Sequence, residues 1–106
     1  MKRLRVMNVA RAAAVLLAAW LVSGCGGALY AVYGSSAASK LEEAKALGAE
    51  QAAPYEYYYA REHMTKASEE AAQADYGDAI DLAEIAEENA EKAIRLTREA
   101  KRGAGR

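Results

Sequence analysis

The fold is decided by the stretch Pro54–Arg102, PYEYYYAREHMTKASEEAAQADYGDAIDLAEIAEENAEKAIRLTREAKR. Its one proline stands at the first position, and the stretch lacks the alternation of apolar and polar residues that predicts a β-strand. Alanine, glutamate, lysine, leucine and arginine are abundant, and these residues lose little conformational entropy in a helix. The stretch therefore predicts an all-α domain.

A break within residues 74–78, ADYGD, divides this stretch into two helices. Pro54 suits a first helical position, so the first helix is expected to begin there and to run to about the start of the break. Gly77 can supply the left-handed residue that closes this helix. Asp75 or Asp78 can cap the next helix, whose first turn follows at once.

Alanines recur every seven residues on both expected helices, so each series lies along one helix face. Folding the chain near residues 76 and 77 brings one series against the other, and small side chains let two helix axes approach to about 8 Å. We predict an antiparallel helical hairpin, or a small three-helix bundle if an upstream helix packs on it. The predicted pairs are Ala74 with Ala79, Ala67 with Ala86, Ala60 with Ala93 and Ala53 with Ala100.

Upstream of the hairpin, a short and weakly apolar helix is expected to begin at Ser36 or Ser39 and to end at Gly48. Residues 36–102 thus make up the predicted α-helical domain, and residues 103–106 are expected to form a frayed tail. Residues 25–35 are rich in Gly, Ala and Ser, a composition that suits a flexible tether.

The first 24 residues have the layout of a signal peptide. The basic opening MKRLRVMNVAR is followed by the uncharged apolar run AAAVLLAAWLV and then by small residues. A helix of this run spans about 16 Å, about half of a hydrocarbon core of about 30 Å, so the run alone is too short to cross a bilayer. Residues 1–24 are therefore predicted to be removed.

The end of this segment, Leu21-Val22-Ser23-Gly24-Cys25, resembles the lipobox of bacterial lipoproteins. The resemblance implies cleavage between Gly24 and Cys25 and a covalent lipid, such as palmitate, on Cys25; we expect no other cofactor. Cys25 is the one cysteine of the chain, which excludes an internal disulfide. The alternative is an uncleaved single-pass anchor in the inner membrane over residues 12–33, which carry no charge.

The charge of the remaining chain bears on its partners. Without residues 1–24 it has ten basic and fifteen acidic side chains, which argues against nucleic acid as a partner. Gly26 follows the cysteine, and lipoproteins that resemble this pattern without Asp at that place usually move on to the outer membrane in Gram-negative bacteria. The resemblance therefore implies a lipid-anchored protein that faces the periplasm.

The string GAEQAAPYE, residues 48–56, together with the DYxxA pattern that begins at Asp75, resembles a family of small bacterial envelope lipoproteins and envelope domains catalogued as a domain of unknown function. In a GDYxxA-like turn of that family, Ala74 stands where Gly is usual. The resemblance covers about residues 40–100. It implies a periplasmic α-helical hairpin and transfers no catalytic residue.

Side chains that support catalysis or metal binding do not converge in this sequence. His63 is the only histidine, and its helical neighbours at three and four residues include no further metal ligand. Acidic pairs such as Glu69-Glu70 point about 100° apart on a helix, so they do not act together as a general acid and base. We therefore expect no enzyme, no catalytic residue and no metal site.

The unusual feature is Tyr55-Glu56-Tyr57-Tyr58-Tyr59, four tyrosines in five residues. If Tyr57 faces the alanine seam, Tyr55 and Tyr58 point away from it and Tyr59 lies at the flank. Tyrosine offers a large contact area, a polar tip and little side-chain entropy to lose. We predict that Tyr55, Tyr58 and Tyr59 dock a partner; the alternative is that the upstream helix covers them.

Two functional hypotheses follow. The first is a non-enzymatic outer-membrane lipoprotein that acts as an interaction or scaffolding subunit, with the membrane and an envelope protein or a second copy of the chain as partners. The alternative is an envelope protein that binds peptidoglycan non-covalently through basic residues near the end of the last helix. These residues are Arg95, Arg98, Lys101, Arg102 and Arg106.

Overall fold

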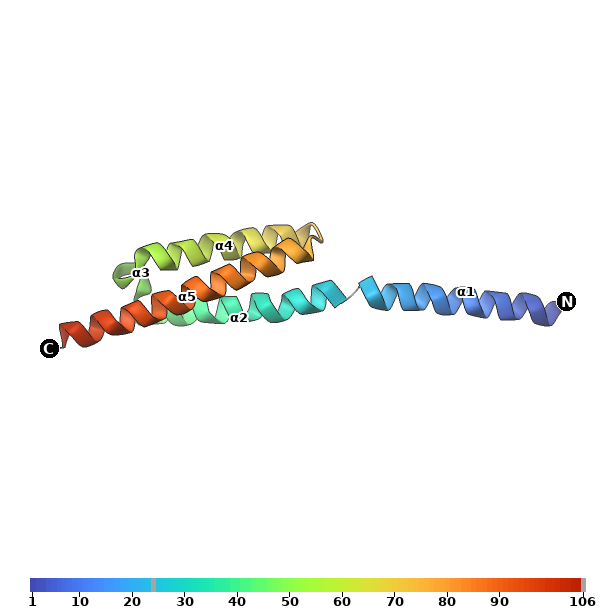
Figure 1. The fold of residues 1–106 in the computed structure, drawn as a ribbon, viewed down its shortest axis with the longest axis horizontal. Coiled ribbons are helices and arrows are strands. Elements are labelled where there is room, and N and C mark those ends of the chain that lie inside the picture. The colour runs from blue at the N-terminus through green and yellow to red at the C-terminus, as the bar shows by residue number, and fades with distance from the viewer. Residues whose placement is uncertain (24, 106) are drawn as a thin grey trace.

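The computed structural model describes residues 1–23 and 25–105, and the side chains of these residues except 21–25. All regular structure in this part of the chain is helical, which confirms the predicted all-α fold. Figure 1 shows α2, α4 and α5 side by side as an elongated bundle, with α1 projecting from one end. The helices are α1 (Lys2–Ser23), α2 (Cys25–Leu47), α3 (Ala49–Ala52), α4 (Pro54–Ala72) and α5 (Tyr76–Ala104).

Helices α4 and α5 form the antiparallel hairpin, and α2 packs along it in the same direction as α5 (Figure 1). Two cross-helix contacts show the register of α2 on α5. The Ser36 hydroxyl donates to the Glu87 carboxylate, and Arg98 Nη2 donates to Glu43 Oε1 at 2.9 Å. Because residue numbers rise together along the two helices, these helices are parallel.

The alanines of the two central predicted pairs face the core: Ala67 and Ala86 belong to one cluster, and Ala60 and Ala93 to another. The same clusters contain Ala83 and Ala90, so the exact pairing stays a prediction. All four side chains are fully buried, and each pair lies in one core cluster. The outer pairs are only half as predicted, because Ala53 and Ala79 are buried whereas Ala74 and Ala100 are exposed.

The core of the bundle consists mainly of methyl groups. Among the described side chains, eleven of the fourteen buried apolar residues are alanines, and the larger ones are Leu41, Tyr57 and Ile94. Small side chains let helices pack at short axial distances, so α5 contacts both neighbours along its length. Its buried alanines recur almost every turn, at Ala79, Ala83, Ala86, Ala90 and Ala93.

The first part of α2 differs from the prediction. Residues 26–35 are helical and packed, so the predicted flexible tether is wrong for these residues. Tyr30 and Tyr33 pack against the cluster of Ala37, Ala67, Ala83 and Ala86. The Gly and Ala content that suggested a flexible segment also permits close helix packing, and Gly34 is buried here.

The connection from α2 to α4 follows the predicted pattern. Gly48 is left-handed, with φ 91°, and ends α2. Ala53 is not helical, with φ −142° and ψ 59°, and Pro54 is the first residue of α4. Glycine adopts such a φ without the steric cost of a Cβ atom, and proline lacks only an N–H that has no helical partner at that position.

The turn from α4 to α5 corrects the sequence prediction. Helix α4 ends at Ala72, and the left-handed residue is Ala74, with φ 61°. Gly77, which was predicted to take that conformation, lies in the first turn of α5 instead. Asp75 is the N-cap residue, although its side chain makes no capping hydrogen bond.

The two ends of the chain contribute little to the core. The large apolar side chains of α1 that are described are exposed, with Trp20 81% exposed, and neither core cluster of the described residues includes one from α1. At the other end, α5 continues to Ala104, so the predicted frayed tail is wrong for Gly103 and Ala104. Arg106 lies outside the described residues.

Candidate functional site

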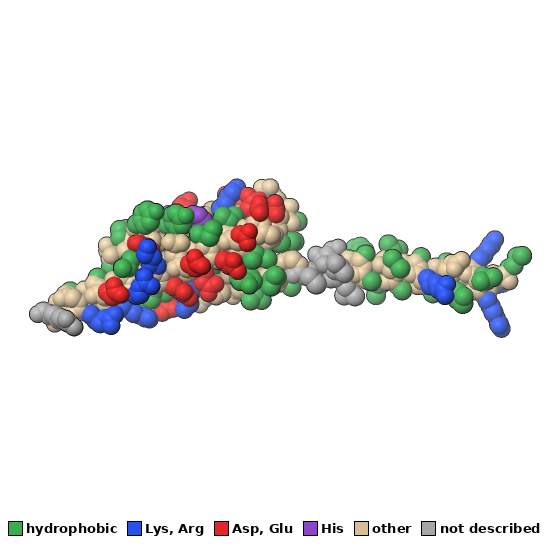
Figure 2. Space-filling model, viewed as in Figure 1, with side chains coloured by type: hydrophobic (Ala, Val, Ile, Leu, Met, Phe, Trp, Pro, Cys, Tyr) green, Lys and Arg blue, Asp and Glu red, His purple; other side chains and the backbone are tan. Residues whose placement is uncertain are grey.

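The tyrosines predicted to dock a partner are exposed. Tyr55 is 71% exposed, Tyr58 40% and Tyr59 39%, because α2 packs against the opposite side of the hairpin. The alternative that the upstream helix covers them is therefore wrong. The three rings line an open hollow of about 460 Å³, the tyrosine groove, together with Pro54, Glu62 and His63. Figure 2 shows apolar side chains gathered on α4 beside the histidine.

A ladder of stacked rings shapes one side of this groove. The ring centroids of Tyr55 and Tyr59 lie 5.9 Å apart, and those of Tyr59 and His63 lie 4.1 Å apart. The spacing of four residues places these rings on successive turns of one helix face. A hydrogen bond of 2.9 Å between His63 Nδ1 and the Tyr59 carbonyl oxygen holds the last ring in place. The ladder is therefore a preformed surface.

Tyr57 connects the groove to the core. It is buried, as predicted, and its ring meets that of Tyr58 edge to face at 5.2 Å. Burial raises the pKa of the Tyr57 hydroxyl above its ordinary value, and the Glu50 carboxylate raises this pKa further. On the outer side, the Arg61 guanidinium lies 4.8 Å from the Tyr58 ring centroid. Tyr58 is thus held between a core ring and a surface cation.

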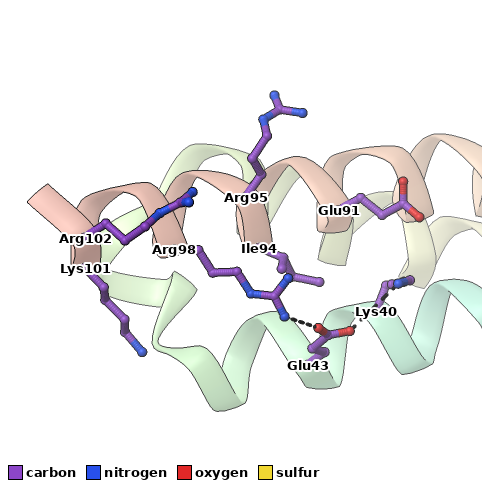
Figure 3. A pocket seen from close by; sticks show the side chains of 8 residues that line it. All are labelled: Lys40, Glu43, Glu91, Ile94, Arg95, Arg98, Lys101 and Arg102. Atoms are coloured by element: carbon purple, nitrogen blue, oxygen red, sulfur yellow. Dashed lines mark hydrogen bonds and ion pairs between the residues drawn. The ribbon is translucent and has the colours of Figure 1, made fainter.

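Four of the basic residues assigned to the alternative function, Arg95, Arg98, Lys101 and Arg102, line one groove beside α2. Arg98 reaches from α5 to Glu43 on α2, and Lys40 Nζ lies 3.8 Å from the same carboxylate (Figure 3). Arg95 points away from α2 and pairs with Glu99 at 3.9 Å. The hollow between the helices has a volume of about 640 Å³ and is called the basic groove. It is lined by Lys40, Glu43, Glu91, Ile94, Arg95, Arg98, Lys101 and Arg102.

Acidic side chains gather at the turn between α4 and α5. Carboxylate oxygens of Glu70, Asp75 and Asp78 lie within 4.8 Å of one another. Lys66 Nζ lies 3.0 Å from Glu70, and the hydrogen bonds and charges of Glu70 and Glu69 raise the pKa of Lys66. Exposed acidic groups of this kind are common on protein surfaces without an ion. We assign no metal site to them.

The predicted cleavage, between Gly24 and Cys25, falls after the last residue of α1 and before the first residue of α2. Gly24 lies outside the described residues, and only the backbone of Cys25 is described, as the first residue of α2. The predicted cleavage and lipid attachment therefore remain predictions. Within residues 1–23 and 25–105, no helix combines the length and hydrophobicity that a membrane crossing requires.

The structure adds site residues that the sequence prediction did not include. His63 and Pro54 belong to the tyrosine groove, and the spacing of Tyr55, Tyr59 and His63 by four residues is a signal that identifies this row. Lys40 and Glu43 belong to the basic groove. No local pattern identifies them, because their position depends on the register of α2 against α5.

Comparison with known proteins assigns the chain to a protein family. Residues 35–104 match the family model described as Domain of unknown function (DUF4398). This match covers α4, α5 and all of α2 from residue 35 onward. No curated protein matches the chain, and no solved structure matches it.

Proposed function

We propose, on the premise that the chain belongs to the DUF4398 family, that it is a non-enzymatic envelope lipoprotein that acts as an interaction or scaffolding subunit at the outer membrane. The observation that carries this proposal is the tyrosine groove. Its three large aromatic side chains face solvent on a bundle whose own core is mostly alanine. Exposed aromatic clusters of this kind are characteristic of binding surfaces.

The groove fits an apolar helix face of another envelope protein. The ring ladder extends over two turns of α4, from Tyr55 to His63, or about 12 Å at about 1.5 Å per residue. Two turns of a partner helix match this length. Around the rings, Arg61, Glu62 and the tyrosine hydroxyls supply polar groups, as at the rim of a protein interface.

The lipobox-like sequence supports anchoring through a lipid on Cys25. Helix α2 begins at Cys25 and runs without a break to Leu47, about 35 Å at about 1.5 Å per residue. A lipid there would hold one end of the bundle at the membrane. The tyrosine groove, near the start of α4, would lie toward the far end, where a periplasmic partner can reach it. Removing α1 would cost the bundle no core residue.

Crosslinking in native membranes tests the scaffold proposal. A photo-crosslinking amino acid at position 58 should capture one envelope protein, identified by mass spectrometry, and the same probe at exposed Glu84 on α5 should not. Tyr55→Ala should reduce the yield from position 58. A crosslinked dimer of this chain would identify self-association, and equal capture from both positions would reject the tyrosine groove as a docking site.

Non-covalent binding of peptidoglycan is a second candidate function. The observation that favours it is the meeting of Arg98, Lys101 and Arg102 with Lys40 in one groove. Muropeptide stems carry carboxylates, which arginine and lysine bind through charge-assisted hydrogen bonds. In a pull-down on purified peptidoglycan, a binder of this kind is released as salt rises, whereas a scaffold without this activity stays unbound at all salt concentrations.

A further inference from the structure

The basic groove already holds one carboxylate of the chain itself. Glu43 accepts a hydrogen bond from Arg98 Nη2 at 2.9 Å and lies 3.8 Å from Lys40 Nζ. The two cations approach it from different helices, α5 and α2 (Figure 3). The groove therefore contains a carboxylate position with donors on both sides.

The same groove has more positive charge than its own carboxylates neutralise. Five basic and two acidic side chains line it. Among the described residues, Lys101 and Arg102 take part in no ion pair, although they lie within the last turn of α5, where positive charge opposes the helix dipole. Ile94, 5% exposed, forms an apolar floor. Such a groove suits an extended anionic chain with an apolar stem.

We infer that the basic groove binds a carboxylate-bearing polymer or peptide, and that Glu43 is an internal competitor for the position between Lys40 and Arg98. The observed Arg98–Glu43 contact shows that this position holds a carboxylate. A ligand carboxylate enters there by displacing Glu43, while Lys101 and Arg102 bind the next carboxylates along the ligand. This inference rests on the second candidate function and names the ligand chemistry of its groove.

Competition between Glu43 and a ligand carboxylate predicts the direction in which each substitution changes the affinity. Glu43→Gln removes the internal carboxylate and leaves Arg98 and Lys40 for the ligand, so binding should become stronger. Lys40→Gln and Lys101→Gln remove cations and should weaken binding. All three positions are at the surface, and exposed ion pairs contribute little to stability, so the bundle should stay folded.

The experiment measures binding of fluorescent poly-L-glutamate to the purified full chain at low salt, by anisotropy. We expect Glu43→Gln to raise the affinity about three- to tenfold and Lys40→Gln or Lys101→Gln to lower it by a similar factor, as for one charge-assisted contact. Glu42→Gln is the control for the first change, because it alters the same charge at the next, exposed residue of α2. Lys92→Gln on α5, outside the groove, is the control for the others.

Each outcome decides the inference. If Glu43→Gln and Glu42→Gln raise the affinity equally, net charge alone governs binding and the internal competitor is refuted. If Glu43→Gln raises the affinity for polyphosphate as much as the affinity for poly-L-glutamate, the groove does not prefer carboxylates and the inference is overturned. Absence of poly-L-glutamate binding by every variant refutes the site.

Purified peptidoglycan separates this inference from the candidate function on which it rests. Binding of poly-L-glutamate with the predicted response to Glu43→Gln, but no binding of peptidoglycan, supports the carboxylate site and rejects the cell wall as its ligand. Binding of both with the same response to Glu43→Gln supports both. If the protein binds peptidoglycan and neither Glu43→Gln nor Lys101→Gln changes this binding, the binding site lies elsewhere on the chain and the inference is overturned.

Discussion

The ring of Tyr76 lies across Gly26, fifty residues earlier in the chain. A Cβ atom at Gly26 would stand 3.0 Å from Tyr76 Cδ2, so the absence of a side chain there lets the ring lie against the start of α2. Tyr76 is also the first residue of α5. This contact ties the beginning of α2 to the α4–α5 turn and makes residues 26–35 part of the bundle.

We expect Tyr76→Ala to loosen the first turns of α2. Amide hydrogen exchange in residues 26–34 should become faster by about tenfold, which corresponds to a loss of about 1.4 kcal/mol of local stability. Tyr55→Ala, which removes an exposed ring from the opposite end of the bundle, is the control. Unchanged exchange in residues 26–34 of the Tyr76 variant would show that the contact does not hold this end.

Larger side chains at the centre of the alanine seam should destabilise the bundle. Ala67→Leu or Ala86→Leu introduces extra volume between fully buried faces of α4 and α5, and such overpacking costs about 1–3 kcal/mol. Thermal unfolding followed by circular dichroism measures the loss. Ala72→Leu, at an exposed position of α4, should leave the melting temperature nearly unchanged. Equal shifts for all three variants would refute the register.

Two substitutions at the turn between α4 and α5 should each stabilise the protein. Ala74→Gly relieves a left-handed alanine and should add about 0.5–1 kcal/mol to the free energy of unfolding. Gly77→Ala should also add about 0.5–1 kcal/mol, because Gly77 is helical and a Cβ atom there meets nothing within 4 Å.

Denaturant unfolding measures both changes at the turn, and Gly48→Ala provides the opposite control. Gly48 is left-handed, so alanine there should lower stability by about 1 kcal/mol. Destabilisation by Gly77→Ala would mean that Gly77, and not Ala74, is the left-handed residue of the turn.

The exposed tyrosines should separate binding from folding. Tyr55→Ala and Tyr58→Ala should each cost at least about 1–2 kcal/mol of partner binding, as interface hot spots do, and change the helicity melt little. Tyr57→Ala should instead cost about 3 kcal/mol of stability, because its buried ring packs in the core. A lowered melt with native crosslink yield for Tyr55→Ala/Tyr58→Ala would make these rings structural.

Cys25 should be the acylated first residue of the mature chain. The intact mass of protein purified from native membranes should equal residues 25–106 plus a lipid. This prediction rests on the sequence, because the apolar run ends at Cys25 in a lipobox-like pattern. A mass of residues 1–106 without lipid would reject the anchor, and Cys25→Ser should release the protein from the membrane fraction if the anchor is correct.

Local sequence determined that α4 and α5 are helices and which of their faces is buried. Pro54 marks the start of α4 because proline suits a first helical turn, and Gly48 marks a left-handed break, so both are readable from one residue and its neighbours. The seven-residue repeat predicted that Ala67 and Ala86 face the core, and both are buried in one cluster. The same periodicity placed Tyr57 in the core.

Tertiary structure alone decided the features that depend on α2. Residues 26–35 have the composition of a tether, but their Tyr30 and Tyr33 pack on the core cluster and Tyr76 packs on Gly26. This packing stabilises a helix that local propensity does not favour. The basic groove exists because α2 runs parallel to α5 and brings Lys40 and Glu43 beside Arg98, fifty-five residues after Glu43. Such contacts join residues far apart in the chain, so neither composition nor spacing encodes them, and only packing of the three helices brings them together.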